Sequence, residues 1–144
     1  MHTGSVLPVA VSLAFVVLAL WHARLALSPP SGESAAVPSV SGTPLFAPSA
    51  GATWTVAVVL LMFACLVAAT AGLVKVGTPQ RILVWLSYAL ALGLAARAVG
   101  EFRYVGLFKR VKDSRFARLD TLVYSPLCLA LAVGVALVAW QHGA

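Results

Sequence analysis

Four long apolar runs dominate the chain and restrict it to a bundle of membrane-spanning helices. They cover approximately residues 5–27, 52–75, 81–100 and 121–141. About 20 consecutive apolar residues allow an α-helix to cross the hydrocarbon core of a bilayer, so each run qualifies. The sequence therefore predicts an all-α, four-transmembrane-helix bundle in which residues 1–144 form a single integral membrane domain.

The composition excludes a water-soluble domain. Hydrophobic residues make up 61% of the chain and charged residues only 10%, whereas a soluble domain carries about a quarter charged residues. A net charge of +6 would suggest nucleic acid as the partner of a soluble protein. Beside apolar spans it indicates anionic lipid headgroups or orientation in the membrane, and we expect membrane lipids as partners, no nucleic acid and no cofactor.

A cleaved signal peptide is the alternative interpretation of the first run, because Ser34-Ala35-Ala36 fits a small-x-small cleavage site. However, the run is longer than the apolar region of a signal peptide, and no Lys or Arg precedes it. We therefore expect a retained helix that places Trp21 and His22 at headgroup level.

Residues 28–50 form the first connection and contain five prolines, two glycines and six serines. These residues disfavour regular helix or strand. Apolar side chains recur between the turn formers, which favours a loop packed on the bundle over a disordered linker.

The second and third runs are joined by the breakers Gly77-Thr78-Pro79-Gln80, which predicts an antiparallel helical hairpin. The start of the fourth helix is ambiguous. Asp120-Thr121 offers one N-cap, and Ser125-Pro126 offers a second start or a kink.

A basic stretch, residues 97–120, holds seven of the ten basic residues and three of the four acids. With both termini on one side, the first and third connections and their helix ends hold eight cations, and the other side holds Lys75 and Arg81. The positive-inside rule then places these connections in the cytoplasm and the termini outside. If the stretch is charged for a functional reason, the opposite orientation stays open.

Two interpretations apply to the residues of this stretch. Arg97 and Glu101 lie one helical turn apart, which predicts an ion pair or an arginine that holds an anionic group while Glu101 orients it. Apolar and cationic residues alternate through the connection at residues 101–120, which predicts either an amphipathic interfacial helix or a solvated basic loop. In a helix, Tyr104, Phe108 and Val111 would share one face.

Other chemistry has little support in the sequence. No histidine pair at helical spacing and no Cys-x-x-Cys is present, so no metal site is expected. Cys65 and Cys128 differ in depth by about 10 Å, so we expect no disulfide between them. His22 with Glu33, Glu101 or Asp120 is a weak candidate for a ligand set or acid/base pair.

The segments RAVGEFRYVGLFKRV (residues 97–111) and RFARLDTLVYSPLCL (residues 115–129) resemble the bacterial membrane-protein family known as domain of unknown function 3995. Trp21-His22 and the Pro-, Gly- and Phe-bearing first loop support the resemblance. It implies four membrane spans in a bacterial inner membrane, but no reaction, substrate or cofactor. It also implies a family signature at Arg97, Gly100, Glu101, Arg103, Tyr104, Asp120, Tyr124, Ser125 and Pro126.

Three functions remain open. The first is binding of an anionic lipid or lipid-linked phosphate at the basic connection, and the second is a small membrane enzyme acting on a lipid or isoprenoid. The third, least favoured because the spans lack polar residues at mid-depth, is a protomer of an oligomeric transporter. The lipid-binding candidates are Arg97, Glu101, Arg103, Tyr104, Lys109, Arg110, Arg115 and Tyr124, and the weak catalytic candidates are Glu101, Asp120, Tyr104 and His22.

Overall fold

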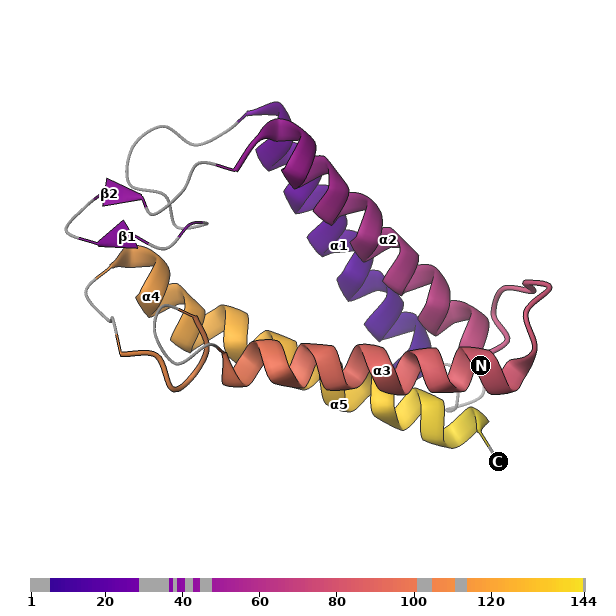
Figure 1. The fold of residues 1–144 in the computed structure, drawn as a ribbon. Coiled ribbons are helices and arrows are strands. Elements are labelled where there is room, and N and C mark those ends of the chain that lie inside the picture. The colour runs from indigo at the N-terminus through magenta and orange to yellow at the C-terminus, as the bar shows by residue number, and fades with distance from the viewer. Residues whose placement is uncertain are drawn as a thin grey trace.

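The computed structural model describes residues 6–28, 37, 39–40, 43–44, 48–100, 105–110 and 114–143. The chain forms α1 (Val6–Leu27), α2 (Ala50–Thr70), α3 (Gln80–Val99), and a continuous helical run of α4 (Arg115–Leu119), the π-helical turn η2 (Asp120–Tyr124) and α5 (Ser125–His142) (Figure 1). Among the described residues, α1, α2, α3 and the run Arg115–His142 are long and apolar enough to cross a membrane. The predicted all-α bundle with four spans is confirmed.

Two helix boundaries differ from those predicted. The second helix ends at Thr70 rather than residue 75, because Gly72 has a φ of +70° and its N–H and that of Leu73 donate to the carbonyls of Ala69 and Ala68. This is the glycine-terminated Schellman arrangement. The last helical run begins at Arg115, well before either predicted start.

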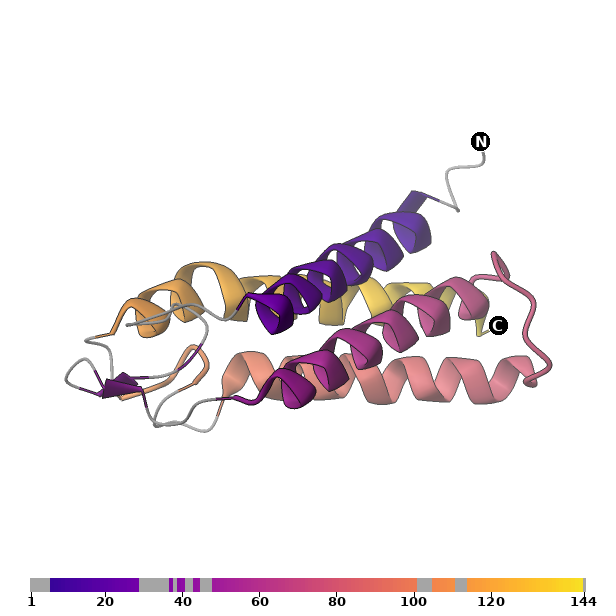
Figure 2. The ribbon, with the colours of Figure 1, turned by 90° about the horizontal axis from the view of Figure 1, so that it is seen from above.

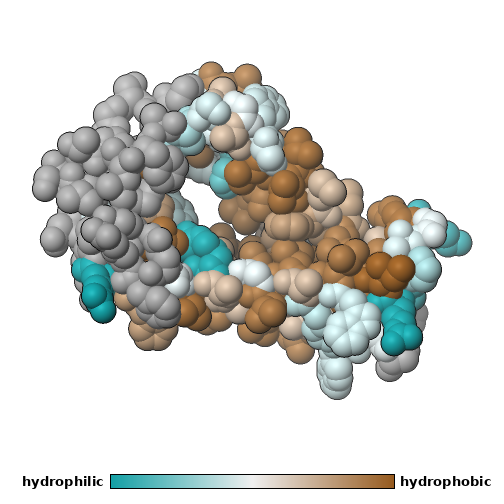
Figure 3. Space-filling model, viewed as in Figure 1, coloured by the Kyte–Doolittle hydropathy of each residue, from teal (hydrophilic) through white to brown (hydrophobic). Residues whose placement is uncertain are grey.

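The helices associate as two antiparallel pairs, α1 with α2 and α3 with α5 (Figures 1 and 2). The start of α1 and the end of α5 lie at the same end of the bundle (Figure 2). The two pairs meet near that end and diverge toward the other, and the space-filling view shows an opening between them (Figure 3). The predicted antiparallel course of the second and third helices is present, but their main packing partners are other helices.

The shared core lies where the two pairs meet. All four spans contribute small or branched side chains to it, and Phe15 of α1 packs edge-on against Phe63 of α2 at 5.8 Å between ring centroids. A Cβ on Gly134 would lie 2.8 Å from Val11 Cγ2, so this glycine allows close approach of α5 to α1. The buried core members are Val11, Phe15, Ala64, Val67, Leu90, Ala91, Leu131, Val135 and Val138.

The outer surface of the spans is apolar, as a lipid-facing surface should be. Leu92 and Leu122 are each 73% exposed, and Val17 and Leu20 are each 64% exposed. Brown, hydrophobic atoms cover much of the helical surface in Figure 3. A surface of this kind is stable in hydrocarbon and not in water.

In the first connection, β1 (Ser39–Val40) pairs antiparallel with β2 (Thr43–Pro44), with Ser39 opposite Pro44 and Val40 opposite Thr43. The expectation of no strand in this loop is therefore wrong for these two short segments. Val37 is buried, which agrees with a packed loop at that position. Most of the remaining loop, including Glu33, lies outside the described residues.

Candidate functional site

A buried carboxylate ties together the end of α3, the connection that follows it and the start of the last helical run. Asp120 is fully buried, and four hydrogen-bond donors surround it. We call Asp120, Arg97, Gly106, Lys109 and Ser125 the Asp120 cluster.

Each oxygen of the Asp120 carboxylate accepts two hydrogen bonds. Arg97 Nη2 donates to Oδ1 at 2.9 Å and Ser125 Oγ donates to the same oxygen at 3.3 Å. The backbone N–H of Gly106 donates to Oδ2 at 2.7 Å, and Lys109 Nζ donates to it at 3.0 Å. The buried charge is therefore both paired and hydrogen-bonded, the condition under which a carboxylate is tolerated away from water.

Lys109 is as enclosed as its partner, with a side chain only 1% exposed. Besides Asp120, its ammonium donates to the Gly106 carbonyl at 3.0 Å and to Thr121 Oγ1 at 2.6 Å. The Thr121 hydroxyl in turn donates to the Ala117 carbonyl. All three ammonium protons thus have acceptors within the protein, so Lys109 has no N–H left for a headgroup.

Two glycines bring the connection close enough to reach Asp120. Gly100 and Gly106 have φ values of +84° and +96°, in the left-handed region that glycine adopts without steric penalty. A Cβ on either would collide with the backbone of the other segment. The Leu107 N–H donates to the Ala98 carbonyl at 2.9 Å and fixes this crossing.

The last helical run presents Asp120 and Ser125 to the cluster through a π-helical turn. Ser114 caps the run by accepting from the Ala117 N–H, and η2 then separates α4 from α5. Pro126 lies at the start of α5 and has no N–H for the preceding turn, which explains why the regular helix is interrupted here.

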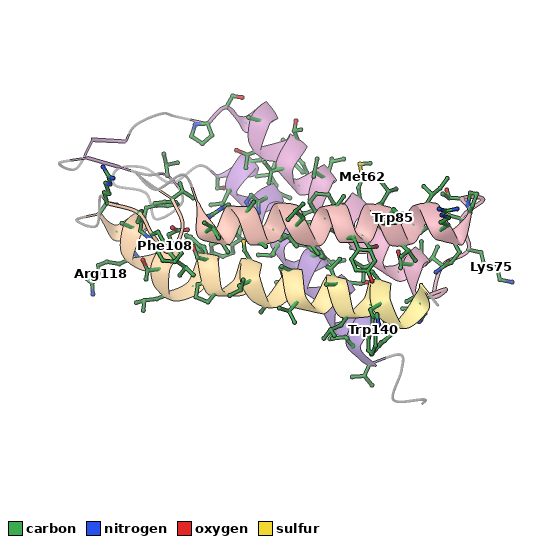
Figure 4. All side chains as sticks on the ribbon, turned by 60° about the horizontal axis from the view of Figure 1, so that its bottom comes forward. Met62, Lys75, Trp85, Phe108, Arg118 and Trp140 are labelled. Carbon is green, nitrogen blue, oxygen red and sulfur yellow. The ribbon has the colours of Figure 1, made fainter. Side chains whose placement is uncertain are left out.

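The predicted interfacial helix is wrong for residues 105–110, which form a turn. The glycine-supported crossing replaces helical hydrogen bonds with contacts to the end of α3 and to Asp120. Val111 and Tyr104 of the expected apolar face lie outside the described residues. Phe108 is 65% exposed and lies near the Asp120 end of the molecule (Figure 4).

The predicted site residues fall into three groups. Glu101, Arg103 and Tyr104 lie outside the described residues, so the proposed pairing of Arg97 with Glu101 stays a prediction. Arg110 and Arg115 are exposed, and Tyr124 is half-buried with its ring 6.0 Å from that of Phe116. The cluster brings together Arg97, Lys109 and Asp120.

His22 lies on α1, and its Nδ1 is bonded to the Leu18 carbonyl at 2.8 Å within the same helix. The proposed acid/base pair of His22 with Asp120 is not formed. Cys65 and Cys128 are free thiols. No group of three or more His, Cys, Asp or Glu side chains suited to a metal ion occurs among the described residues.

Lys109 and Arg110 form a matched pair for mutation, because they are adjacent cations of which one is buried and one exposed. We expect Lys109→Met to lower the free energy of unfolding by about 2 kcal/mol, since Asp120 keeps Arg97, Gly106 and Ser125 as partners. Arg110→Met should change it by no more than about 0.5 kcal/mol. Unfolding in mixed neutral-detergent and dodecyl sulfate micelles, followed by far-ultraviolet circular dichroism, measures both. Equal losses would contradict the assigned role of Lys109.

Comparison with known proteins gives one match. A family model described as "Protein of unknown function (DUF3995)" matches residues 15–135. No curated protein and no solved structure matches the chain. The matched range contains every member of the Asp120 cluster and most of the four spans, and it confirms the resemblance carried by the basic stretch. The chain therefore belongs to the DUF3995 family of proteins of unknown function.

Proposed function

We propose that this protein is a multi-pass protein of the bacterial inner membrane that binds an anionic phospholipid through Arg97. The observation that carries the proposal is the state of the Arg97 guanidinium. Its Nη2 is held by Asp120, whereas its Nη1 is enclosed and has no hydrogen-bond acceptor among the described residues. A buried donor without an acceptor costs about 1–3 kcal/mol, which a phosphate oxygen bound there would recover.

The Arg97 side chain is anchored by Asp120 but is not sealed from the surface. The Arg97 side chain is 36% exposed, although its partner Asp120 is fully buried. Asp120 thus fixes Nη2, and other atoms of the side chain reach the surface, whereas a phosphate reaches Nη1 only when the groups around it move apart. Phosphate recognition by arginine uses such a fixed fork, because two nitrogens act in defined directions.

The site lies at the depth of lipid headgroups. Arg97 occupies the last turn of α3, whose 20 residues rise about 30 Å, the thickness of the hydrocarbon core. Counting about 20 residues back from His142 reaches Val123, so Asp120 falls just beyond the hydrocarbon. A lipid phosphate therefore meets Arg97 without leaving its normal depth.

Exposed cations at this end of the bundle support both the ligand and the orientation. Arg24, Arg110, Arg115 and Arg118 are exposed here, against Lys75 and Arg81 at the other end, and Figure 4 shows Arg118 and Lys75 at opposite ends. Lys109, which is internal, is removed from this count. The excess of exposed cations at this end of the bundle favours a cytoplasmic location for the Asp120 cluster.

No observation on the described residues specifically supports the other two functions, a membrane enzyme and a transporter protomer. An acid/base role for Asp120 would need a free lone pair or a proton to exchange, but both of its oxygens accept two hydrogen bonds within a closed cluster. A transporter path and a homo-oligomer stay predictions.

Native mass spectrometry of the full chain in neutral detergent tests the proposal. All proteins compared carry Arg81→Gln, so that the guanidinium at the opposite end of the bundle does not contribute. We expect phosphatidylglycerol to bind about tenfold more tightly than diacylglycerol, which has no phosphate, and Arg97→Lys to remove most of that preference. Lysine keeps the charge and the pairing with Asp120, but one ammonium cannot bridge carboxylate and phosphate through two separate nitrogens.

Arg118→Gln is the matched control, because it removes an exposed cation at the same end. It should weaken phosphatidylglycerol binding by no more than about twofold. If Arg97→Lys retains the preference, or if Arg118→Gln loses as much, general surface charge explains the binding and the Arg97 site is rejected. Circular dichroism of each variant confirms that the helices are intact.

A further inference from the structure

A second candidate site lies at the other end of the bundle, between the first turns of α3 and the last turns of α5. Here the surface contains an open cleft of about 700 Å³. It shares no residue with the Asp120 cluster and does not depend on the function proposed for Arg97. Its lining residues are Gln80, Arg81, Val84, Trp85, Tyr88, Trp140, His142 and Gly143.

The walls of the cleft are held by contacts between three helix ends. Gln80 Nε2 donates to the Thr70 carbonyl at the end of α2, at 2.8 Å, and to the His142 carbonyl at the end of α5, at 3.2 Å. The His142 ring is bonded through Nδ1 to the Val138 carbonyl at 2.9 Å. The cleft is therefore part of the folded bundle and does not need a ligand to form.

Its interior is aromatic and unusually open to the surroundings. Trp85 is 65% exposed and Trp140 is 69% exposed, although both side chains are large. The Trp85 ring also packs edge-on against the Tyr88 ring, with 6.2 Å between the ring centroids. Figure 4 shows Trp85 on α3 and Trp140 on α5, toward the end of the bundle that carries Lys75. These flat, apolar faces suit an acyl chain near the membrane surface.

The rim of the cleft is positively charged. Arg81 is the charged member of the lining, and it lies one turn nearer the helix end than Trp85. The two ion pairs found among the described residues both use Asp120, so Arg81 has no carboxylate partner there. An exposed guanidinium above aromatic walls is complementary to a ligand with an anionic head and an apolar tail.

We propose that this cleft binds an anionic phospholipid, with its phosphate at Arg81 and an acyl chain against Trp85 and Trp140. Together with the Arg97 site, it gives the protein lipid sites at both membrane surfaces. The two sites are independent, because one depends on a guanidinium anchored by Asp120 and the other on an unpaired guanidinium beside an aromatic cleft.

Tryptophan fluorescence tests this proposal locally. The chain has four tryptophans, and Trp21 and Trp54 lie in the parts of α1 and α2 remote from the cleft. In a Trp21→Phe, Trp54→Phe background, emission reports Trp85 and Trp140 alone. The purified full chain in neutral detergent is titrated with phosphatidylglycerol or phosphatidylcholine brominated on the acyl chain, since bromine quenches indole emission at close range.

We expect half-maximal quenching at about tenfold lower concentration of phosphatidylglycerol than of phosphatidylcholine, and Arg81→Gln should abolish this difference. Lys75→Gln, which removes an exposed cation at the same end but outside the cleft, should preserve it. Equal quenching by both lipids, or an equal loss with Lys75→Gln, would overturn the proposal. So would displacement of the lipid by glycerol phosphate as readily as by unbrominated phosphatidylglycerol, because that result describes a headgroup site without an acyl chain.

Discussion

Asp120→Asn is expected to lower the free energy of unfolding by about 4 kcal/mol, the largest effect of any single polar substitution in the described part of the chain. Asparagine has nearly the same shape as aspartate, so the loss arises from charge and hydrogen bonding. All four groups around the carboxylate are donors. The amide nitrogen of asparagine would face two of them, and the Lys109 ammonium would stay buried without a counter-ion.

Two further variants distinguish the loss of charge and hydrogen bonding from a general loss of packing. Ser125→Ala removes one long hydrogen bond to the same carboxylate and should cost about 1 kcal/mol. Adding Lys109→Met to Asp120→Asn should recover part of the stability, because it removes the uncompensated cation. The free energy of unfolding of all three variants is measured in mixed micelles. If Asp120→Asn loses no more than Ser125→Ala, the carboxylate is not the centre of the cluster.

Gly106→Ala is expected to lower the free energy of unfolding by about 3 kcal/mol or more. At a φ of +96° an L-side chain is strained, and its Cβ would collide with the Val99 carbonyl and the Gly100 backbone. The same displacement would move the Gly106 N–H away from Asp120 Oδ2, so local strain and loss of a buried hydrogen bond add together.

Gly93→Ala is the matched control for this substitution. Gly93 lies inside α3, and a Cβ built there meets no atom within 4 Å apart from its own helix backbone and chain neighbours. Alanine should therefore raise stability by about 0.5–1 kcal/mol, since it is the better helix former. The measurement is the shift of the unfolding midpoint in mixed micelles. Opposite signs for the two variants support the glycine-dependent crossing, and equal losses contradict it.

The four spans were predictable because each is a long apolar run, a signal that depends only on neighbouring residues. The same reasoning correctly placed breakers between the second and third helices. It misplaced the end of α2, since a glycine in the left-handed conformation ended the helix before the apolar run ended. It also misplaced the start of the last helix, because the Ser114 cap and α4 lie before the apolar run.

Of the site, only the charged members were predictable from the sequence, and their contacts were not. Arg97, Lys109 and Asp120 are recognisable as charges at a membrane boundary, but helical periodicity relates residues three or four apart. The bonds of Asp120 to Arg97 and Lys109 span 23 and 11 positions and arise from the folded connection. Gly106 gave no sequence signal of its own, and Thr121 appeared only as part of a candidate helix cap. Gly106 matters because of its backbone conformation, and Thr121 because of an ammonium brought to it by tertiary structure.

The separation of these charges along the chain has a consequence for biosynthesis. Arg97 and Lys109 leave the ribosome before Asp120, so the third hydrophobic segment and the connection after it reach the translocon before the carboxylate that pairs with both cations in the fold. The pairing of both cations with Asp120 becomes possible only when residue 120 emerges, immediately ahead of the fourth segment. The third and fourth segments are thus expected to partition into the bilayer together, because the Asp120 carboxylate pairs with one cation in the last turn of the third segment and one in the connection after it.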